Sequence, residues 1–149
     1  TILNTEHTWP QSRFPSGFRK DLLKSDMHHL YPSDNQLNSI RGNNRFGEVS
    51  SPDRELKCPQ SRIGRDGRGN WIFEPPRGHR GNVARALFYF SVRYDIGIGA
   101  EEEAALRKWH LDDPVDEFEA YRNGEIEKAQ GNRNVFIDRP ELVNQISDF

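Results

Sequence analysis

The chain has 149 residues, enough for one domain with a buried core, and its 34% hydrophobic, 30% charged and 11% aromatic residues are typical of a soluble globular protein and exclude a disordered chain. No run approaches the roughly 20 apolar residues that cross a bilayer, so we expect no membrane partner. The formal net charge of -2 does not by itself indicate a nucleic-acid-binding protein, and a single cysteine, Cys58, excludes an internal disulfide.

The charge is unevenly distributed along the chain. Residues 1–98 contain 15 Lys and Arg against 10 Asp and Glu, whereas residues 99–149 contain 6 against 13. Most basic residues of the first part are arginines, whose guanidinium groups fit phosphates in a bidentate manner. This distribution suits a phosphate-rich ligand, with the acidic 101–119 segment facing away from it, although a solvated Arg-rich surface would have the same composition.

The first part of the chain is predicted to contain two short strands. Thr1–Trp9 is expected to be a strand that ends at Pro10, because proline interrupts a ladder of hydrogen bonds. Residues 11–25 are expected to form a loop with one helical turn around Lys20–Lys24. Met27–Tyr31 is the second strand candidate.

A helix is predicted directly after this second strand. Ser33 is a suitable N-cap, and Asp34 lies in the positive first turn. Leu37 and Ile40 fall on one side of the helix, and Gly42-Asn43-Asn44 is expected to end it.

The rest of the chain is expected to be mostly helical. Residues 47–70, rich in Ser, Pro, Gly and Arg, should be loop with a short strand near Arg62–Ile63, and Trp71–Phe73 should be another strand. Gly78–Tyr94 is the clearest helix, because apolar residues recur at helical spacing from Val83 onward. Three further helices are expected at Glu101–His110, Val115–Lys128 and Pro140–Ile146. The predicted fold class is α+β, dominated by helices, with few short strands.

Three polar clusters near the N-terminus contain the residue types from which catalytic sites are built. They are Asn4–Pro10, Asp26–Pro32 and Asn38–Asn43. Strand, loop, strand and helix make a compact unit that can bring Glu6, His7 and Asn38 together. Neighbours on an ideal strand point to opposite faces, so Glu6 and His7 can share one ligand only if the backbone turns there.

These clusters resemble the bacterial endonuclease I family, whose core is a ββα-metal (His-Me) finger. Glu6-His7-Thr8-Trp9-Pro10 matches the family's first strand, and Asn38 stands six residues after Pro32, as the helix asparagine of the family does. Arg77–Arg85 is similar to the family's Arg-Gly-x-Ile-Ala-Arg helix entry. Gln130–Ile137 is similar to its Gln-Gly-Asn-x-Asn-Pro-Phe stretch, with Val135 in place of the proline. The segment Asp26-Met27-His28-His29-Leu30-Tyr31-Pro32 is similar to the family's Asp-x-His-x-Leu-x-Pro second strand, which makes five motifs. They occur in the family's order and span nearly the whole chain.

The resemblance implies a single nuclease domain over residues 1–149, with a finger core at about 1–46 and a helical remainder at about 77–149. His7 would be the general base, because an imidazole accepts a proton at neutral pH. Glu6 and Asn38 would supply oxygen ligands to one Mg²⁺, or to another divalent cation such as Mn²⁺. The expected products carry a 5′-phosphate and a 3′-hydroxyl. A hydrogen bond to the second ring nitrogen of His7 should fix its tautomer, but the sequence does not identify that partner.

The supporting residues are expected mainly among the arginines. Arg19 and Arg41 are candidates for a catalytic phosphate contact. Further contacts to the nucleic-acid backbone are expected from Arg13, Arg62, Arg65 and Arg68.

Behind the metal site, the resemblance places His28 as a hydrogen-bonded support, with Asp26 in the same network. The neighbouring pair His28-His29 has neither a cysteine partner nor a histidine at helical spacing, so we expect no zinc site there.

The function expected from these residues is sequence-nonspecific endonuclease activity on double- and single-stranded DNA, and also on RNA. The alternatives are a noncatalytic nucleic-acid-binding protein and a phosphodiesterase for small nucleotides. We expect a monomer. Members of the family are commonly secreted or periplasmic, and the resemblance implies the same location here. Because the chain begins at Thr1 rather than at Met, we expect Thr1 to be either a processing boundary, where a leader could have been removed, or the edge of the expressed segment.

Overall fold

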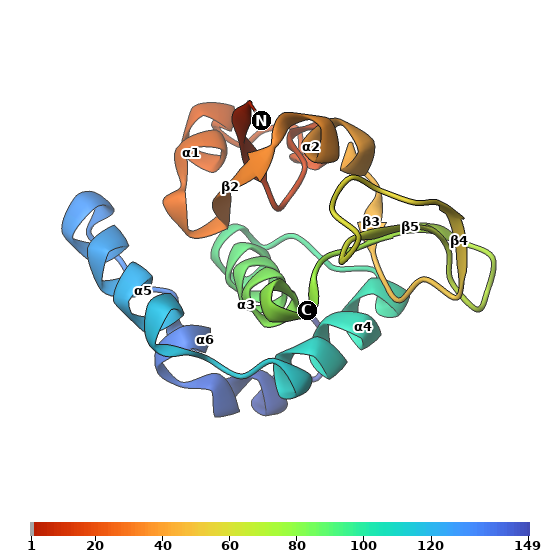
Figure 1. Cartoon of the computed structure of the whole chain (residues 1–149). Coiled ribbons are helices and arrows are strands. Elements are labelled where there is room, and N and C mark those ends of the chain that lie inside the picture. The colour runs from red at the N-terminus through yellow and green to blue at the C-terminus, as the bar shows by residue number, and fades with distance from the viewer. Residues whose placement is uncertain (1) are drawn as a thin grey trace.

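The computed structural model describes residues 2–149, so the first residue of the predicted N-terminal strand, Thr1, lies outside the described residues. Figure 1 shows the long helix α3 at the centre, with the N-terminal strands on one side of it and α4 and α5 on others. The helices are α1 (Lys20–Ser25), α2 (Asn35–Arg41), α3 (Arg77–Tyr94), α4 (Ala100–Asp112), α5 (Glu117–Gln130) and α6 (Val135–Asp138). The strands are β1 (Leu3–His7), β2 (Leu30–Asp34), β3 (Arg45–Phe46), β4 (Ser51–Arg54), β5 (Arg62–Arg65) and β6 (Trp71–Glu74). The α+β class is confirmed.

The N-terminal unit is an antiparallel pair, β1 and β2, followed by α2, which is the predicted order of elements. The second strand begins three residues later than expected, at Leu30, because Met27–His29 forms a 3₁₀ turn. The Asp26 carboxylate caps that turn by accepting a hydrogen bond from the backbone amide of His28. The predicted strand at Met27–Tyr31 is therefore wrong in its first half.

The N-cap of α2 also differs from the prediction. Asp34 rather than Ser33 caps the helix, and its Oδ1 accepts from the backbone amides of Gln36 and Leu37 at 2.9 and 3.2 Å. Ser33 remains in β2, where it pairs with Asn4. Both residues are good caps, and the register of the strand decides between them. Gly42, with a φ of 53°, ends the helix as predicted.

The middle of the chain contains more sheet than expected. A second sheet has the strand order β3-β6-β5-β4; β3 was not predicted, and β4 lies in the 47–70 region that was predicted to be mostly loop. Every residue of β4 is exposed, and Pro52 interrupts the alternation, so the sequence there has no period-two signal. The strands near Arg62–Ile63 and at Trp71–Phe73 are confirmed as β5 and β6.

Close approach of β4 to β5 requires glycine at position 64. A Cβ on Gly64 would lie 2.2 Å from the carbonyl oxygen of Ser51 and 2.8 Å from the Cα of Pro52. We expect Gly64→Ala to destabilise the fold by about 1–3 kcal/mol, because backbone atoms must move to admit the methyl group. Urea unfolding measures this, with Gly67→Ala as the control, since a Cβ on Gly67 would meet no atom within 4 Å. Equal stability of the two variants would contradict the expectation.

Helix α3 forms the centre of the core. It extends over the predicted Gly78–Tyr94 segment, and Val83, Leu87 and Phe90 of its apolar stripe are buried. Helix α4 packs along it, and the Met27–His29 turn rests against its second half. The predicted helices at 101–110 and 115–128 are confirmed as α4 and α5, and the last predicted helix is a 3₁₀ segment, Pro140–Gln145.

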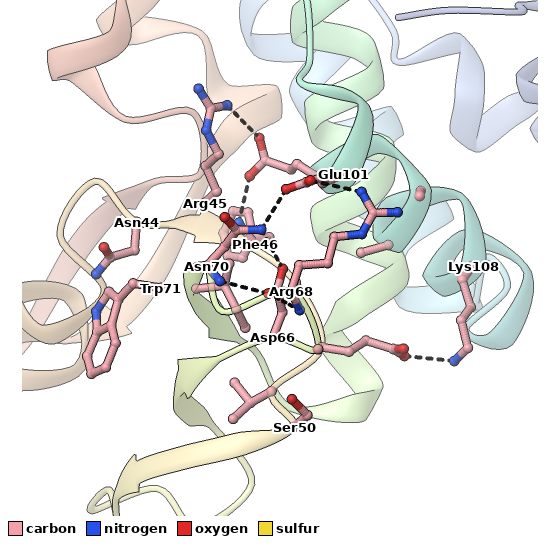
Figure 2. Close-up of a pocket in the computed structure, with 18 of the residues that line it drawn as sticks. Asn44, Arg45, Phe46, Ser50, Asp66, Arg68, Asn70, Trp71, Glu101 and Lys108 are labelled. Carbon is pink, nitrogen blue, oxygen red and sulfur yellow. Dashed lines mark hydrogen bonds and ion pairs between the residues drawn. The ribbon is translucent and has the colours of Figure 1, made fainter.

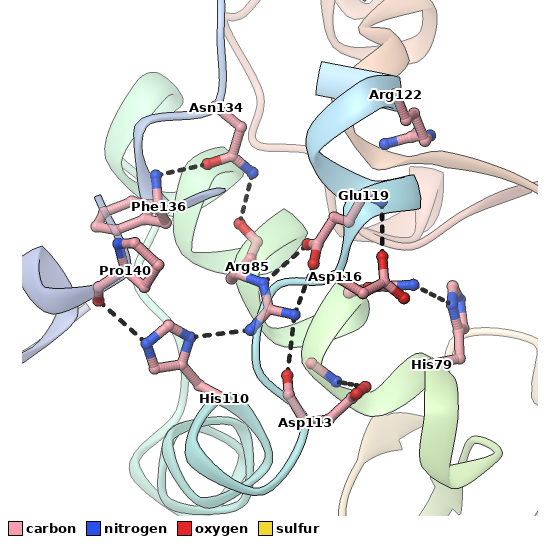
Figure 3. A network of polar contacts seen from close by, with 12 residues as sticks. His79, Arg85, His110, Asp113, Asp116, Glu119, Arg122, Asn134, Phe136 and Pro140 are labelled. Atoms are coloured by element: carbon pink, nitrogen blue, oxygen red, sulfur yellow. Dashed lines mark hydrogen bonds and ion pairs between the residues drawn. The ribbon is translucent and has the colours of Figure 1, made fainter. Parts of the chain in front are cut away.

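A buried ion pair joins α3 to α5. Figure 3 shows the guanidinium of Arg85 between Glu119, His110 and the backbone of Asp113. Its two hydrogen bonds to Glu119 measure 2.8 and 2.7 Å, and neither side chain is more than 1% exposed.

Among residues 2–149, none of the helices has both the length and the apolar character of a membrane span.

Candidate active site

His7 is the last residue of β1, and its half-buried ring is held at both nitrogens. Nε2 lies 3.0 Å from the carbonyl oxygen of Lys24, at the end of α1. Because a carbonyl oxygen only accepts, Nε2 must carry the proton. Nδ1 is then the basic nitrogen, and it accepts from the Gln11 amide at 3.2 Å. The carbonyl of Lys24 is therefore the tautomer-fixing partner that the sequence could not identify.

Burial lowers the pKa of His7 below its ordinary value of 6.5, and the hydrogen bond to Lys24 opposes this shift. The ring is therefore neutral at pH 7, and the lone pair on Nδ1 can accept a proton once the Gln11 amide releases it.

A cavity of about 700 Å³ opens beside this ring, and we call it the His7 cavity. It lies between β1, the end of α1 and the helix α2, and Asn38 of α2 lines it together with His7. The Asn38 side-chain nitrogen donates to the carbonyl of Thr5 at 3.3 Å. Its side-chain oxygen is therefore left as an available acceptor or metal ligand. The structure thus brings two of the three central residues to one cavity.

Glu6 does not line the His7 cavity. Strand β1 is regular through this point, with Glu6 opposite Tyr31 and His7 opposite Leu30, so the turn needed to bring both side chains to one face is absent here. Glu6 lines a different, smaller cavity of about 210 Å³. Its Oε1 lies 3.5 Å from Nη1 of Arg41. Burial raises the pKa of Glu6, and the charge of Arg41 opposes this shift.

Arg41 is placed differently from the expectation of a phosphate contact. Its side chain is only 2% exposed, and its two terminal nitrogens donate to the carbonyls of His7 and Thr8 at 3.1 and 2.8 Å. Burial lowers the pKa of its guanidinium to about 10. Although Arg41 borders the His7 cavity, its hydrogen bonds hold the end of β1 in place. The observed contacts of Arg41 are thus structural, and its phosphate contact stays a prediction.

Arg19 does not line the His7 cavity either. It is the exposed residue before α1, and its guanidinium forms a 2.5 Å ion pair with Asp21. Arg13 is half-buried, donates to the carbonyl of Asn43 and lies 3.9 Å from Glu102. Neither arginine is brought beside His7, and Arg13 instead lines a neighbouring groove.

This neighbouring groove has a volume of about 1010 Å³ and runs between the second sheet and α4, and we call it the Trp71 groove. Figure 2 shows Arg68 and Asn70 directed at Glu101 on its wall. Glu101 and Glu102 of α4 line the groove, so the acidic segment does not all face away from the basic part of the chain. Basic and acidic side chains are paired along it.

Arg62 and Arg65 lie on β5 and do not line this groove. Arg62 is 3.6 Å from Glu74, and Arg65 stands over the ring of Trp71 at 5.7 Å. Of the four arginines expected to contact a nucleic-acid backbone, only Arg13 and Arg68 thus share one surface depression.

Asp26 and His28 form the predicted polar network, but it does not touch His7. Asp26 accepts hydrogen bonds from Tyr89, Tyr94 and Gln130 at 2.8, 2.6 and 2.9 Å. Burial opposes the ionisation of Asp26, yet these bonds outweigh it and hold its pKa below the ordinary value. The His28 ring contacts the carbonyl of Asn132 at 3.0 Å. The network fixes the start of the Met27–His29 turn.

Sequence reasoning missed two side chains that contact His7. Gln11 follows His7 by four residues, and an amide in a loop gives no distinguishing signal. His29 packs its ring against that of His7 with a centroid separation of 5.5 Å. The resemblance pointed to His28, and only the conformation of the 3₁₀ turn shows that its neighbour faces the site. Within residues 2–149, no group of three or more His, Cys, Asp or Glu side chains could hold a metal ion.

Comparisons with known proteins agree with the motifs. Residues 1–141 match the family model described as Endonuclease I. The chain is 37% identical to an extracellular ribonuclease of Bacillus subtilis, over 96% of this chain and 53% of that protein. It is 33% identical to a periplasmic deoxyribonuclease of Aeromonas hydrophila, over 78% and 48% of the two chains. The chain thus spans about half the length of the curated relatives that it matches. The motifs, their order and the match over almost the whole chain show that it belongs to the endonuclease I family.

Proposed function

We propose that this chain is a nuclease that hydrolyses phosphodiester bonds in DNA and RNA, with His7 as its general base. The observation that carries the proposal is the single tautomer of His7, whose unprotonated Nδ1 contacts Gln11 in the same cavity that Asn38 lines. Its relatives support the substrate class, because one is named an extracellular ribonuclease and another a periplasmic deoxyribonuclease.

In this mechanism Nδ1 of His7 takes a proton from a water molecule, and the resulting hydroxide attacks phosphorus in line with the departing 3′ oxygen. The P–O3′ bond breaks, the departing 3′ oxygen takes a proton from a second water molecule, and the products carry a 5′-phosphate and a 3′-hydroxyl. The imidazolium formed in this step is stabilised by the Lys24 carbonyl, which already accepts from Nε2. Gln11 must release Nδ1 before water can reach it, because its amide occupies that nitrogen.

We propose that Asn38 and Glu6 hold one Mg²⁺ or Mn²⁺; they line two different cavities in this structure, so the Glu6 side chain would have to turn toward Asn38 for both to bind the same ion. Both offer oxygen, the ligand type that these cations prefer, and two protein ligands leave room for water and phosphate. The Asn38 side-chain oxygen is unengaged. Burial raises the pKa of Glu6, and the positive charge of Arg41 only partly opposes this shift, so a bound cation would further stabilise the ionised carboxylate. The cation would stabilise the charge that develops on the phosphoryl group.

The substrate should be recognised without base specificity. The Trp71 groove pairs its cations with carboxylates, so it offers no dense track of free positive charge. Backbone contacts would then be few, and the rate should depend on salt less steeply than in a protein with many phosphate contacts.

The relatives' names also support a secreted or periplasmic location for this protein.

Removal of divalent metal is the direct test of the cofactor. We expect EDTA to abolish nicking of a supercoiled plasmid and added Mg²⁺ to restore it. Asn38→Ala should raise the Mg²⁺ concentration that gives half-maximal rate about tenfold or more, which corresponds to the loss of about 1.4 kcal/mol of binding. Gln36→Ala, which removes an exposed amide from the same helix, is the matched control. Cleavage in EDTA at the full rate would contradict the metal assignment.

A further inference from the structure

The short helix α1 ends in a set of carbonyl groups that have no partners within the helix, as the last turn of any helix does. Side chains form hydrogen bonds to the carbonyls of four consecutive residues, from Asp21 to Lys24. The Ser25 hydroxyl donates to the carbonyls of Asp21 and Leu22 at 2.7 and 3.4 Å. The His29 ring lies 2.7 Å from the carbonyl of Leu23, and the His7 ring lies 3.0 Å from the carbonyl of Lys24. Two histidines therefore hold consecutive carbonyls.

His29 is entirely buried and is limited to one donor role. Its exposed fraction is 0%, and burial lowers its pKa to about 4, so the ring is neutral. Its contact with the Leu23 carbonyl requires the proton on Nε2, and Nδ1 is buried without a hydrogen-bond partner. The ring also packs against the ring of Phe90, with a centroid separation of 4.3 Å and an interplanar angle of 34°, so both the ring and its single N–H are fixed in direction.

The backbone of His29 is bound on the other side of His7. Its carbonyl oxygen accepts from the amide of Thr8 at 2.9 Å, directly after His7. His29 therefore contacts two segments. Its backbone carbonyl binds the residue that follows β1, the strand that carries His7, and its ring binds the end of α1, whose Lys24 carbonyl orients the His7 ring. The two rings meet edge to face, at an interplanar angle of 74°.

We propose that His29 is a positioning residue for His7, which it serves by holding the Leu23–Lys24 turn so that the Lys24 carbonyl is fixed opposite Nε2. The inference rests on the proposed role of His7 as general base. Loss of the His29 donor would leave the Leu23 carbonyl buried and unpaired, so the turn would shift and the bond between Lys24 and His7 would lengthen. His7 would then exchange its proton between both ring nitrogens, and the protonated Nδ1 cannot act as a base.

Two substitutions separate this role from simple packing. His29→Phe retains a ring in the aromatic cluster but removes the donor. His29→Gln loses the ring but keeps an amide N–H that can reach the Leu23 carbonyl. If His29 positions the turn, the Gln variant should remain close to the parent protein and the Phe variant should not. If His29 only packs, the order should be reversed.

The first measurement is the ¹⁵N chemical shift pair of the His7 ring in metal-free protein. We expect the parent protein and His29→Gln to show one protonated and one unprotonated nitrogen, and His29→Phe to show averaged shifts.

The second measurement is cleavage of a short fluorogenic oligonucleotide in Mg²⁺, where His29→Phe should lower kcat about 10- to 100-fold and leave KM unchanged. His110→Phe is the matched control, because His110, which lies on α4, is also buried and its ring also contacts a backbone carbonyl, that of Pro140, at 3.1 Å. It should lower stability without changing the His7 tautomer.

The outcomes separate the two proposals. Parent-like shifts and kcat in His29→Phe would overturn the positioning role. Averaged shifts with an unchanged kcat would leave the positioning role intact and overturn the role of His7 as base. If His29→Phe does not fold, His29→Gln decides alone, since averaged shifts and a low kcat in that variant would also overturn the inference.

Discussion

Replacement of His7 by alanine is expected to lower the rate of plasmid nicking by about 10²–10⁴-fold, the range that a positioned general base contributes. The fold should survive, because the ring is half-buried and its two polar contacts, to Lys24 and Gln11, lie at the rim of the His7 cavity. Initial nicking rates in Mg²⁺ and a urea unfolding curve measure the two effects separately.

His7→Gln is the informative companion to this variant. Its amide can still donate to the Lys24 carbonyl, but it has no basic nitrogen, so it should be as inactive as His7→Ala. Added imidazole should restore part of the rate in the alanine variant. Nicking by His7→Ala at the rate of the parent protein would contradict the mechanism. A parent protein that binds DNA without cutting it, or that hydrolyses only small phosphodiesters, would favour one of the two alternative functions.

The largest loss of stability is expected from Glu119→Ala. Arg85 would retain its charge inside the protein without its bidentate partner, and breaking such a pair costs about 3–5 kcal/mol. His110 and the carbonyl of Asp113 remain near the guanidinium but cannot neutralise it (Figure 3). For a chain of this length the cost corresponds to a fall in Tm of about 6–20 °C, measurable by calorimetry.

Two controls show whether the unpaired charge causes this loss. The double variant Arg85→Met/Glu119→Leu removes both charges and should recover much of the stability. Glu141→Ala removes one partner of the exposed pair between Arg139 and Glu141 and should leave Tm unchanged. A Glu119→Ala variant as stable as Glu141→Ala would show that the buried pair is not needed.

Much of the fold could be predicted where the pattern of apolar residues is strong. Helix α3 carries a clear stripe from Val83 to Tyr94, and its predicted bounds differ from the observed ones by one residue. The strands β3 and β4 were missed because the first has two residues and the second is exposed throughout. The start of β2 was misplaced because the hydrogen bond from the His28 amide to Asp26 makes a turn from residues that suit a strand.

The site was predicted less completely, because the sequence shows which residue types are present but not the direction in which each side chain points. Spacing placed His7 and Asn38 on elements that meet, and they line one cavity. The same alternation that was noted along β1 places Glu6 elsewhere. Arg41 was a candidate for a catalytic phosphate contact, and a sequence does not show that this arginine is covered by Phe46, whose ring lies 4.3 Å from the guanidinium. Backbone groups such as the Lys24 carbonyl carry no residue signature at all.

The bonds that hold Asp26 have a consequence for the order in which the protein forms. They join residue 26 to Tyr89, Tyr94 and Gln130, so the sequence separations reach 104 residues. Contacts of such separation form late, because the long intervening loop must first be closed. During synthesis His7 leaves the ribosome before Gln130, so the hydrogen bonds that support the Met27–His29 turn are complete only after Gln130 has emerged. A nascent chain would therefore contain His7 and the Met27–His29 turn long before the bond from Gln130 to Asp26 can form.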